Sequence, residues 1–497
     1  MGIMRTKSVE QSIRDTEEPE FQLRKALGPI DLTVFGIGVI IGTGLFVLTG
    51  VAAANFAGPA ISLSYVLSGI ACALAALCYA EFASTVPVAG SAYTFSYASL
   101  GEFIAWIIGW DLVLEFIVGA SAVSVGWSGY FGKILESFFG ISLPQAITGE
   151  GVVNVPAMCI ALLLTVILVI GIRTSSAVNI TITTIKLAVT LIFIGIGIFL
   201  VNTANWSPFI PPPGGTVASA STEGGEPSLL QAILGIAGQS FGVTGIITGA
   251  AIVFFAYIGF DVVATTSEEA RNPQRDLPIG ILASLGICTV LYVVASLILT
   301  GILPYTQLGT DAPMATALSA AGQNWAAGLI SLGVIAGLTS VIMILILGQS
   351  RVAFAMSRDN LLPRWFARTH PRFRTPYRIT IITGVIVALM AGFVNLKQLA
   401  ELTNIGTLFA FVLVSIGVIV LRRTNPDLRR AFRTPLVPVV PILAVLACFL
   451  LMVFLPVGTW IRFVVWMVVG LVVYFAYSVR NSRLARSEGV EEAAPEA

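Results

Sequence analysis

The sequence has few charged residues for its length. Asp, Glu, Lys and Arg make up 11% of its 497 residues, and the formal net charge is +1, whereas a soluble domain carries about 25% charged residues. Hydrophobic residues make up 56%, which is more apolar surface than one water-facing core can bury. The composition therefore indicates a protein solvated largely by lipid. The small net charge excludes electrostatic binding of nucleic acid as its main function.

Histidine and cysteine are scarce as well. The one histidine is His370, and no cysteine pair has the CxxC spacing, which argues against a zinc site. The five cysteines lie in apolar segments, where buried thiols are more common than disulfides: Cys72, Cys78, Cys159, Cys288 and Cys448. The chain also lacks the metalloprotease motif HExxH. We therefore expect no enzyme, no metal and no cofactor.

Long apolar segments are abundant. A bilayer core of about 30 Å needs about 20 apolar residues per helix, and twelve segments meet this requirement. The predicted fold class is therefore an all-α polytopic membrane protein with 12 transmembrane helices. The first segment is too long for the core of a signal peptide. The segments are 31–55, 60–86, 101–130, 153–172, 177–201, 244–266, 278–302, 322–356, 376–394, 399–421, 437–454 and 459–479.

Glycine-rich runs interrupt two of these segments. They are FGIGVIIGTG at 35–44 in the first helix and FFAYIGFD at 254–261 in the sixth. The two runs are five helices apart, so two five-helix halves would have opposite orientations in the membrane. Broken helices at matching places in inverted repeats indicate the substrate site of a transporter. The alternative for the first run is a packing face formed by Gly38 and Gly42.

The distribution of positive charge predicts the orientation. Most of the 27 Lys and Arg residues flank the membrane on the side of the two termini, and that side is cytoplasmic by the positive-inside rule. We expect a multi-pass protein of the plasma membrane. The predicted organisation is a cytoplasmic tail at 1–30, a five-helix repeat at 31–201, an extracellular loop at 202–243, a second five-helix repeat at 244–421, two further helices at 435–479 and a cytoplasmic tail at 480–497.

Two broken helices offer peptide groups that match both ends of an amino acid. The N-terminal end of a half-helix attracts a carboxylate, and the C-terminal end presents carbonyls to an ammonium group. Irregular backbone of this kind persists within a bilayer only around a polar cavity. The predicted N–H donors belong to Gly42, Thr43 and Gly44. The predicted carbonyl acceptors belong to Ile40, Phe255, Ala256 and Ile258.

Ionisable residues within spans are costly and are by default functional. Lys186 lies near the middle of the fifth segment, about 15 Å from either end at the helical rise. It either couples a proton to transport or pins the broken first helix. Asp261 either caps the second half-helix or belongs to a proton path. Asp111 and Glu115 share one helical face. Either one of them faces the cavity, or one bonds across helices and the other lies near an interface. Glu81 is either a gate or a solvated helix end.

Three motifs resemble a known family. They are GIGVIIGTGLFVLTG at 36–50, GWDLVLEFIVGASAVSVGWSGY at 109–130 and FFAYIGFDVVATTSEEARNPQRDLPIGI at 254–281. The chain resembles the amino acid–polyamine–cation superfamily, specifically its cationic amino acid transporter branch. The resemblance implies a LeuT-like architecture with a five-plus-five inverted repeat, broken first and sixth helices and two extra C-terminal helices.

The resemblance also implies roles for single residues. Thr43 and Gly44 would receive the substrate carboxylate, and Phe255 would act as an aromatic gate. Lys186 matches the lysine that replaces a sodium site in proton-coupled members. The carbonyls that would receive the α-amino group are those of Ile40, Phe255, Ala256 and Ile258.

Side-chain specificity depends on two further residues. Met343, in the run SVIMILILGQ at 340–349, favours small neutral substrates such as alanine if it faces the pocket. Glu115 favours cationic substrates if it faces the cavity. We expect a proton-coupled symporter of small neutral amino acids with broad specificity. The alternatives are a transporter of arginine and lysine, an exchanger or sodium-driven carrier, and a receptor that binds amino acids without moving them. The expected partners are an amino acid, a proton and membrane lipid, and the sequence leaves an accessory subunit open.

Overall fold

The computed structural model describes residues 27–85, 91–148, 153–171, 176–214, 226–235, 240–370, 373, 375–428 and 430–483. Regular secondary structure in these ranges is entirely helical, and strand-like pairing is limited to isolated bridges such as Leu27 with Ala270. The predicted all-α class is confirmed. Most of the two predicted cytoplasmic tails and part of the predicted extracellular loop lie outside the described residues.

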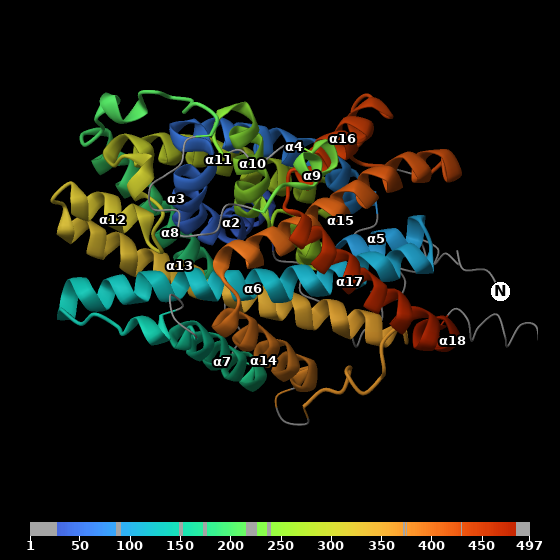
Figure 1. Ribbon diagram of the computed structural model, residues 1–497. Helices are drawn as coiled ribbons and strands as arrows, with labels where there is room; N and C mark the ends of the chain where they lie inside the picture. Colours follow the sequence, from blue (N-terminus) through green and yellow to red (C-terminus); the bar gives the residue numbers. More distant parts are fainter. Residues whose placement is uncertain are drawn as a thin grey trace, which may run out of the picture.

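The helices follow the predicted apolar segments along the chain (Figure 1). The principal α-helices are α2 (Pro29–Ile40), α3 (Thr49–Ala52), α4 (Ile61–Thr85), α5 (Ser91–Ser99), α6 (Glu102–Phe139), α7 (Val155–Ile170), α8 (Ser176–Ile198), α9 (Leu229–Leu234), α10 (Gly242–Val253), α11 (Pro273–Ile302), α12 (Pro313–Ala320), α13 (Asn324–Arg358), α14 (Tyr377–Phe393), α15 (Leu396–Thr424), α16 (Val439–Val453) and α17 (Val457–Val473). Short π- and 3₁₀-helices join them at the breaks: η1 (Gly44–Leu48), η2 (Ala53–Ala57), η6 (Phe254–Tyr257) and η7 (Asp261–Glu269).

Eight helical stretches in the described part of the chain are long and apolar enough to cross a membrane. They are Gly44–Thr85, Glu102–Phe139, Ile180–Ile198, Gly242–Ala264, Pro273–Ile302, Asn324–Arg358, Leu396–Thr424 and Val457–Asn481. Four shorter apolar helices, α2, α7, α14 and α16, fall below the length that a bilayer core requires on its own. The twelve-span topology and the inverted repeat therefore stay predictions.

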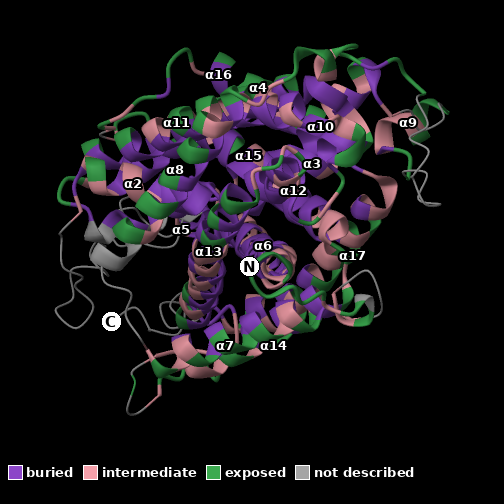
Figure 2. Cartoon of the chain, turned by 90° about the vertical axis from the view of Figure 1, so that its left-hand side faces the viewer, coloured by how far each residue is buried: buried purple, intermediate pink, exposed green. Residues whose placement is uncertain are grey.

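The interior is formed where the long helices pack on one another. The long helix α6 packs along α13, α11 packs against α4 and α2, and α7 pairs with α14. Buried residues lie towards the middle of this assembly, while exposed residues lie on its outside (Figure 2). Many exposed residues are large and apolar, such as Phe199, Leu446 and Val472. An apolar outer surface is expected of a protein that contacts lipid.

Helical geometry is interrupted inside both glycine-rich runs. Helix α2 ends at Ile40, Ile41 is extended with φ −71° and ψ 107°, and η1 begins at Gly44. Helix α10 continues as η6, after which Ile258 is extended with ψ 132° and Gly259 has φ 119°. That positive φ is accessible to glycine and strained for other residues. A Cβ at Gly259 would also approach Val39 Cγ1 to 2.6 Å.

Three short helices lie in stretches that the sequence presents as connections. These are α5 between the second and third apolar segments, α9 within the 202–243 loop and α12 within 303–321. The third long helix, α6, also continues past the predicted end at residue 130 to Phe139. The predicted segment positions are thus close to the observed helices, whereas short helices in the connections were missed.

An ionic cluster ties the end of α4 to the segment after α15. The Arg422 guanidinium donates to both carboxylate oxygens of Glu81, at 2.9 and 2.7 Å. The Thr434 N–H donates to Glu81 Oε2 at 2.7 Å, and Arg430 Nε lies 3.4 Å from Oε1. Glu81 is therefore neither a solvated helix end nor an isolated carboxylate. We call Glu81, Arg422, Arg430 and Thr434 the α4 latch.

Candidate functional site

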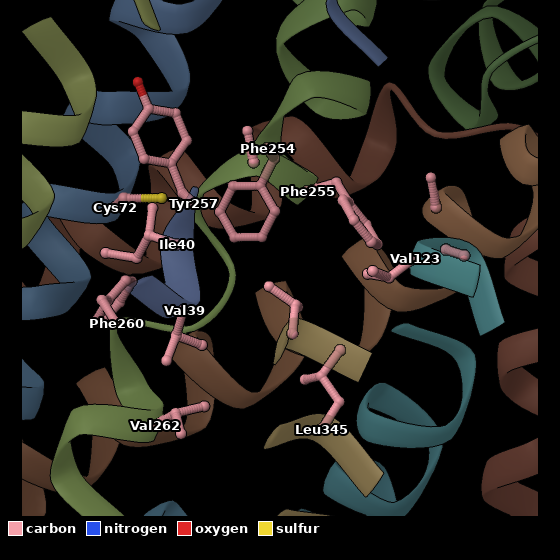
Figure 3. Packing of buried hydrophobic residues seen from close by; sticks show 14 of the residues in the cluster. Val39, Ile40, Cys72, Val123, Phe254, Phe255, Tyr257, Phe260, Val262 and Leu345 are labelled. Carbon is pink, nitrogen blue, oxygen red and sulfur yellow. The ribbon is translucent and has the colours of Figure 1, made fainter. Parts of the chain in front are cut away.

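A small cavity lies where the two interrupted helices meet. Its volume is about 20 Å³. The backbone of both breaks forms one side, and aliphatic side chains of α6 and α13 form the other. Figure 3 shows Phe255 and Val123 at this cavity, with Leu345 reaching towards it from α13. The lining residues are Val39, Ile40, Gly42, Thr43, Gly44, Glu115, Gly119, Val123, Phe255, Ile258, Val341 and Leu345.

The two breaks touch at Gly44 and Ala256. A Cβ built on Gly44 would overlap Ala256 Cα, its backbone nitrogen and its Cβ. Glycine is therefore required at residue 44 so that η1 can lie directly against η6. At Gly42 the nearest side-chain atom to an added Cβ is Val341 Cγ2, at 3.7 Å. The two neighbouring glycines thus differ: one allows backbone contact, and the other leaves open space in the cavity.

Hydrogen-bond donors gather at the start of η1. The first N–H groups of a helix have no partner within that helix, and Gly42, Thr43 and Gly44 occupy this position. Thr43 is fully buried, and no hydrogen-bond partner for its Oγ1 exists among the described residues. Its side chain packs towards Gly126 of α6, where an added Cβ would approach Thr43 Cγ2 to 2.7 Å. The predicted carboxylate-binding residues therefore lie together on the cavity wall.

A tyrosine that the sequence did not single out bridges the two breaks. Tyr292 of α11 places its hydroxyl 2.8 Å from the Ile40 carbonyl oxygen and 2.9 Å from that of Ala256. A hydroxyl carries one hydrogen, so it donates to one of these carbonyls at a time. Of the four predicted acceptors, Ile40, Phe255 and Ile258 line the cavity. Ala256 does not line it.

Lys186 lies beside the first break and outside the cavity. It is fully buried on α8, and its Nζ donates to the Gly38 carbonyl at 2.5 Å. Its aliphatic stem packs on Gly337 of α13, where a Cβ would lie 2.7 Å from Lys186 Cγ. The ammonium group thus reaches the last turn of α2, two residues before Ile40.

The buried carboxylates occupy different positions around the cavity. Glu115 lines it, and its Oε1 has no hydrogen-bond partner among the described residues. Asp111, one turn earlier on α6, faces α15, because a Cβ on Gly406 would lie 2.8 Å from Asp111 Oδ1. Asp261 is buried in the first turn of η7 and does not line the cavity. The structure therefore places Glu115 at the site and Asp111 and Asp261 beside it.

Comparison with known protein families assigns nearly the whole chain to one family. The sequence model of the amino acid permease family matches residues 27–477. The chain belongs to this family. The resemblance to the amino acid–polyamine–cation superfamily is thereby confirmed, and this permease is a membrane-spanning transporter rather than an enzyme.

Three proteins similar in sequence to this permease carry names of different transported substrates. It is 47% identical over 492 residues to the branched-chain amino acid permease BcaP of Bacillus subtilis, covering 97% of this chain and 99% of the relative. It is 47% identical over 468 residues to the methylthioribose transporter of the same organism, covering 93% and 95%. It is 38% identical over 434 residues to the vacuolar cationic amino acid transporter 4 of Arabidopsis thaliana, covering 86% and 68%.

The contribution of α13 to the permease cavity differs from the prediction. Val341 and Leu345 line the cavity, whereas Met343 does not. Residues four apart share one face of an α-helix, and the residue midway between them points to the opposite side. Met343 therefore lies outside the lining of this cavity, and the condition under which it would favour small substrates is not met there. The helix is apolar on every side, so its hydrophobic pattern could not identify the face that meets the cavity.

The cavity walls suit binding rather than covalent chemistry. Most of the wall is aliphatic, and its polar part consists of backbone groups, the Thr43 hydroxyl and the Glu115 carboxyl. Within the described residues, no group of three His, Cys, Asp or Glu side chains could hold a metal ion. A small molecule would find hydrogen-bond donors at one end, carbonyl acceptors at the other and an apolar face opposite Phe255.

Proposed function

We propose that this permease is a secondary active transporter that carries small neutral L-amino acids together with protons. It would act in the plasma membrane with both termini cytoplasmic, and the repeats would comprise 31–201 and 244–421. The observation that carries the proposal is that both interrupted helices open onto one cavity. Free peptide groups of opposite polarity meet there beneath an aliphatic wall, which is the complement of a zwitterion with an apolar side chain.

The proposed pose uses both ends of the amino acid. The α-carboxylate accepts hydrogen bonds from the N–H groups of Gly42, Thr43 and Gly44, where the partial positive charge of a helix start also favours an anion. The α-ammonium donates to carbonyls of Ile40, Phe255 and Ile258. The placement of these residues around one cavity supports the pose.

The aliphatic wall supports neutral substrates. Val123, Val341 and Leu345 offer no partner to a charged head group, and burying an unpaired charge is costly. The printed name of BcaP, a branched-chain amino acid permease, agrees with aliphatic side chains. The Glu115 carboxyl and the cationic amino acid transporters among the relatives favour the alternative of arginine and lysine.

Transport requires the cavity to enlarge and close again. A volume of about 20 Å³ holds one or two water molecules rather than an amino acid. The protein would therefore open towards one side, bind substrate and rearrange around it. This is alternating access at a midplane site, and substrate would shift the equilibrium by binding one arrangement more tightly.

Lys186 is proposed to link protonation to this cycle. Its ammonium group donates to the Gly38 carbonyl near the end of α2. A neutral amine is a weaker donor than an ammonium group, since charge-assisted hydrogen bonds are the stronger ones. Loss of the proton would therefore loosen the first half-helix. Asp261, in the first turn of η7, is proposed to contribute to the same coupling.

Uptake into liposomes tests the proposal. The purified permease is reconstituted, and labelled alanine, leucine, arginine and methylthioribose are offered with and without an inward proton gradient. We expect alanine and leucine to accumulate about tenfold for a gradient of one pH unit if one proton is carried, because one unit corresponds to about 1.4 kcal/mol. Equal uptake with and without the gradient would contradict the coupling. Preferential arginine uptake would select the cationic alternative, and sodium dependence would select a sodium-driven carrier.

A further inference from the structure

A second cavity lies beside α10, and its lining shares no residue with that of the central cavity. Its volume is about 40 Å³. It is enclosed by α10, the first turns of α15, the segment containing α9 and the turn between α16 and α17, which also come together in Figure 1. In the proposed topology this is the extracellular side. Residues Thr248 and Ile252 of α10 line it, one turn before η6 reaches the central cavity.

The second cavity is polar where the central cavity is aliphatic. Seven of its eleven lining residues have polar or charged side chains. Three of these are charged: Glu401 and Lys397, which stand one turn apart on α15, and Glu226, whose carboxylate accepts a hydrogen bond from the Gly458 N–H. The lining therefore suits a small charged molecule rather than a hydrocarbon group.

Glu401 presents an unsatisfied carboxylate oxygen in this cavity. Its side chain is buried, with 3% of the residue exposed. The Thr459 hydroxyl donates to Oε2 at 3.0 Å, whereas Oε1 has no hydrogen-bond partner among the described residues. Buried carboxylate oxygens without a donor are rare, because desolvation costs free energy that only a hydrogen bond or a countercharge returns. Glu401 therefore calls for a cationic donor from elsewhere.

The neighbouring lysine does not supply that donor. The Lys397 ammonium lies over the Phe56 ring, 5.4 Å from its centroid. No ion pair joins it to Glu401 in the described ranges, although both residues belong to them. Besides Glu226, which is bonded to the Gly458 N–H, the cavity thus holds a Glu401 carboxylate oxygen that lacks a donor and a lysine ammonium that lies on an aromatic ring.

We propose that this second cavity is an outer binding site for a zwitterion, with the ligand ammonium on Glu401 and the ligand carboxylate on Lys397. One helical turn separates the two residues by about 5.4 Å along the axis. Two charged side chains one turn apart on a helix can meet the two ends of an α-amino acid, each through a charge-assisted hydrogen bond. A metal cation would leave the Lys397 ammonium unused, whereas a zwitterion uses both charged groups of α15. The inference rests on the proposed function, because it takes the transported amino acid as the ligand.

The position of the outer site relates it to the central one. Phe56 lies in η2, at the end of the helical stretch that starts at the first break, and α10 leads into the second break. A ligand on Glu401 and Lys397 would therefore contact the outer half of each interrupted helix. A volume of about 40 Å³ holds a few water molecules, so this cavity, like the central one, must widen to hold the amino acid before those half-helices admit it.

Binding stoichiometry tests the outer site. Labelled leucine is titrated by equilibrium dialysis into the purified, full-length permease in nanodiscs without phosphatidylethanolamine, a lipid whose head group is also an ammonium zwitterion. We expect two leucines per chain in the wild type and one in Glu401→Gln and in Lys397→Gln, with at least tenfold weaker binding at the lost site. Leu345→Trp fills the central cavity and should also bind one leucine per chain, at the outer site. The double variant Leu345→Trp, Glu401→Gln should bind none.

Control variants and lipid composition separate the outcomes. Glu136→Gln removes an exposed carboxylate that pairs with Lys133 on α6, and it should retain two sites. Phosphatidylethanolamine in the nanodisc should leave the count at two, and a reduction to one would overturn the assignment to a free amino acid. One leucine in the wild type, lost in Leu345→Trp and kept in Glu401→Gln, would overturn the outer site alone. No bound leucine in any variant would overturn the proposed function as well.

Discussion

Lys186 combines complete burial with a bond to the interrupted helix. In Lys186→Ala the Gly38 carbonyl loses this donor, and the group proposed to carry the proton is gone. We expect proton-driven accumulation of alanine to fall about tenfold under a one-unit pH gradient, while exchange of internal for external alanine continues. Liposome uptake and counterflow measure the two quantities.

A matched lysine serves as the control for this prediction. Lys133 lies near the outer end of α6 and pairs with Glu136, so Lys133→Ala should keep full accumulation. If Lys186→Ala kept it too, the lysine would be structural and the proton would be carried elsewhere.

Leu345 closes the aliphatic wall of the central cavity. Replacing it with alanine removes three carbon atoms beside Phe255 and Gly119 and leaves room for a longer side chain. We expect the ratio of phenylalanine to alanine uptake to rise about tenfold, since a methylene-sized difference in an apolar pocket is worth about 1–3 kcal/mol. Competition of unlabelled phenylalanine against labelled alanine measures this ratio. Met343→Ala lies off the cavity and should leave the ratio unchanged; an equal effect of both variants would refute the assigned face of α13.

At the scale of elements, the contact between η1 and η6 depends on one missing side chain. Gly44→Ala introduces a Cβ that overlaps the Ala256 backbone, so the two half-helices must separate. Gly42→Ala adds the same methyl group where the nearest side-chain atom is 3.7 Å away. We expect Gly44→Ala to reduce uptake more than a hundredfold and Gly42→Ala to reduce it less than tenfold. Uptake rates normalised to the amount of folded protein provide the measurement, and similar losses in both variants would contradict the close approach.

The sequence predicted which helices carry the site better than it predicted which side of each helix faces the cavity. Residues 35–44 and 254–261 could be chosen because glycines are costly inside helices and are kept where the backbone must bend or approach closely. Tyr292 could not be chosen from the sequence, because a tyrosine in an apolar span resembles an ordinary core residue. Its role becomes visible when the structure places its hydroxyl between the carbonyls of Ile40 and Ala256. Helix α9 was missed because it has six residues, too few to show a helical period.

At the scale of the whole molecule, the α4 latch joins distant parts of the chain. Glu81 accepts bonds from Arg422 and Thr434, more than 300 residues further along. Glu81→Gln leaves the two arginines without their anion. We expect a loss of about 2 kcal/mol in unfolding free energy, below the range for fully buried pairs because the Arg422 side chain is 26% exposed.

Thermal unfolding in detergent measures the contribution of the latch. The melting temperature should fall by several degrees in Glu81→Gln and remain within one degree in Glu136→Gln, whose partner Lys133 is exposed to solvent. An unchanged melting temperature in Glu81→Gln would mean that water and lipid head groups replace the latch at no cost.

The hydroxyl of Tyr292 stands between two peptide oxygens and has a single hydrogen to share. Without substrate, these two carbonyl oxygens therefore share fewer hydrogen-bond donors than they can accept. A primary ammonium group brings three hydrogens, a monomethylated one brings two, and a quaternary one brings none. Molecules of equal charge and similar shape would consequently be ranked by how many hydrogens their nitrogen still carries. Betaines, whose nitrogen carries no hydrogen, would therefore be rejected for lack of donors although their charges match those of an amino acid.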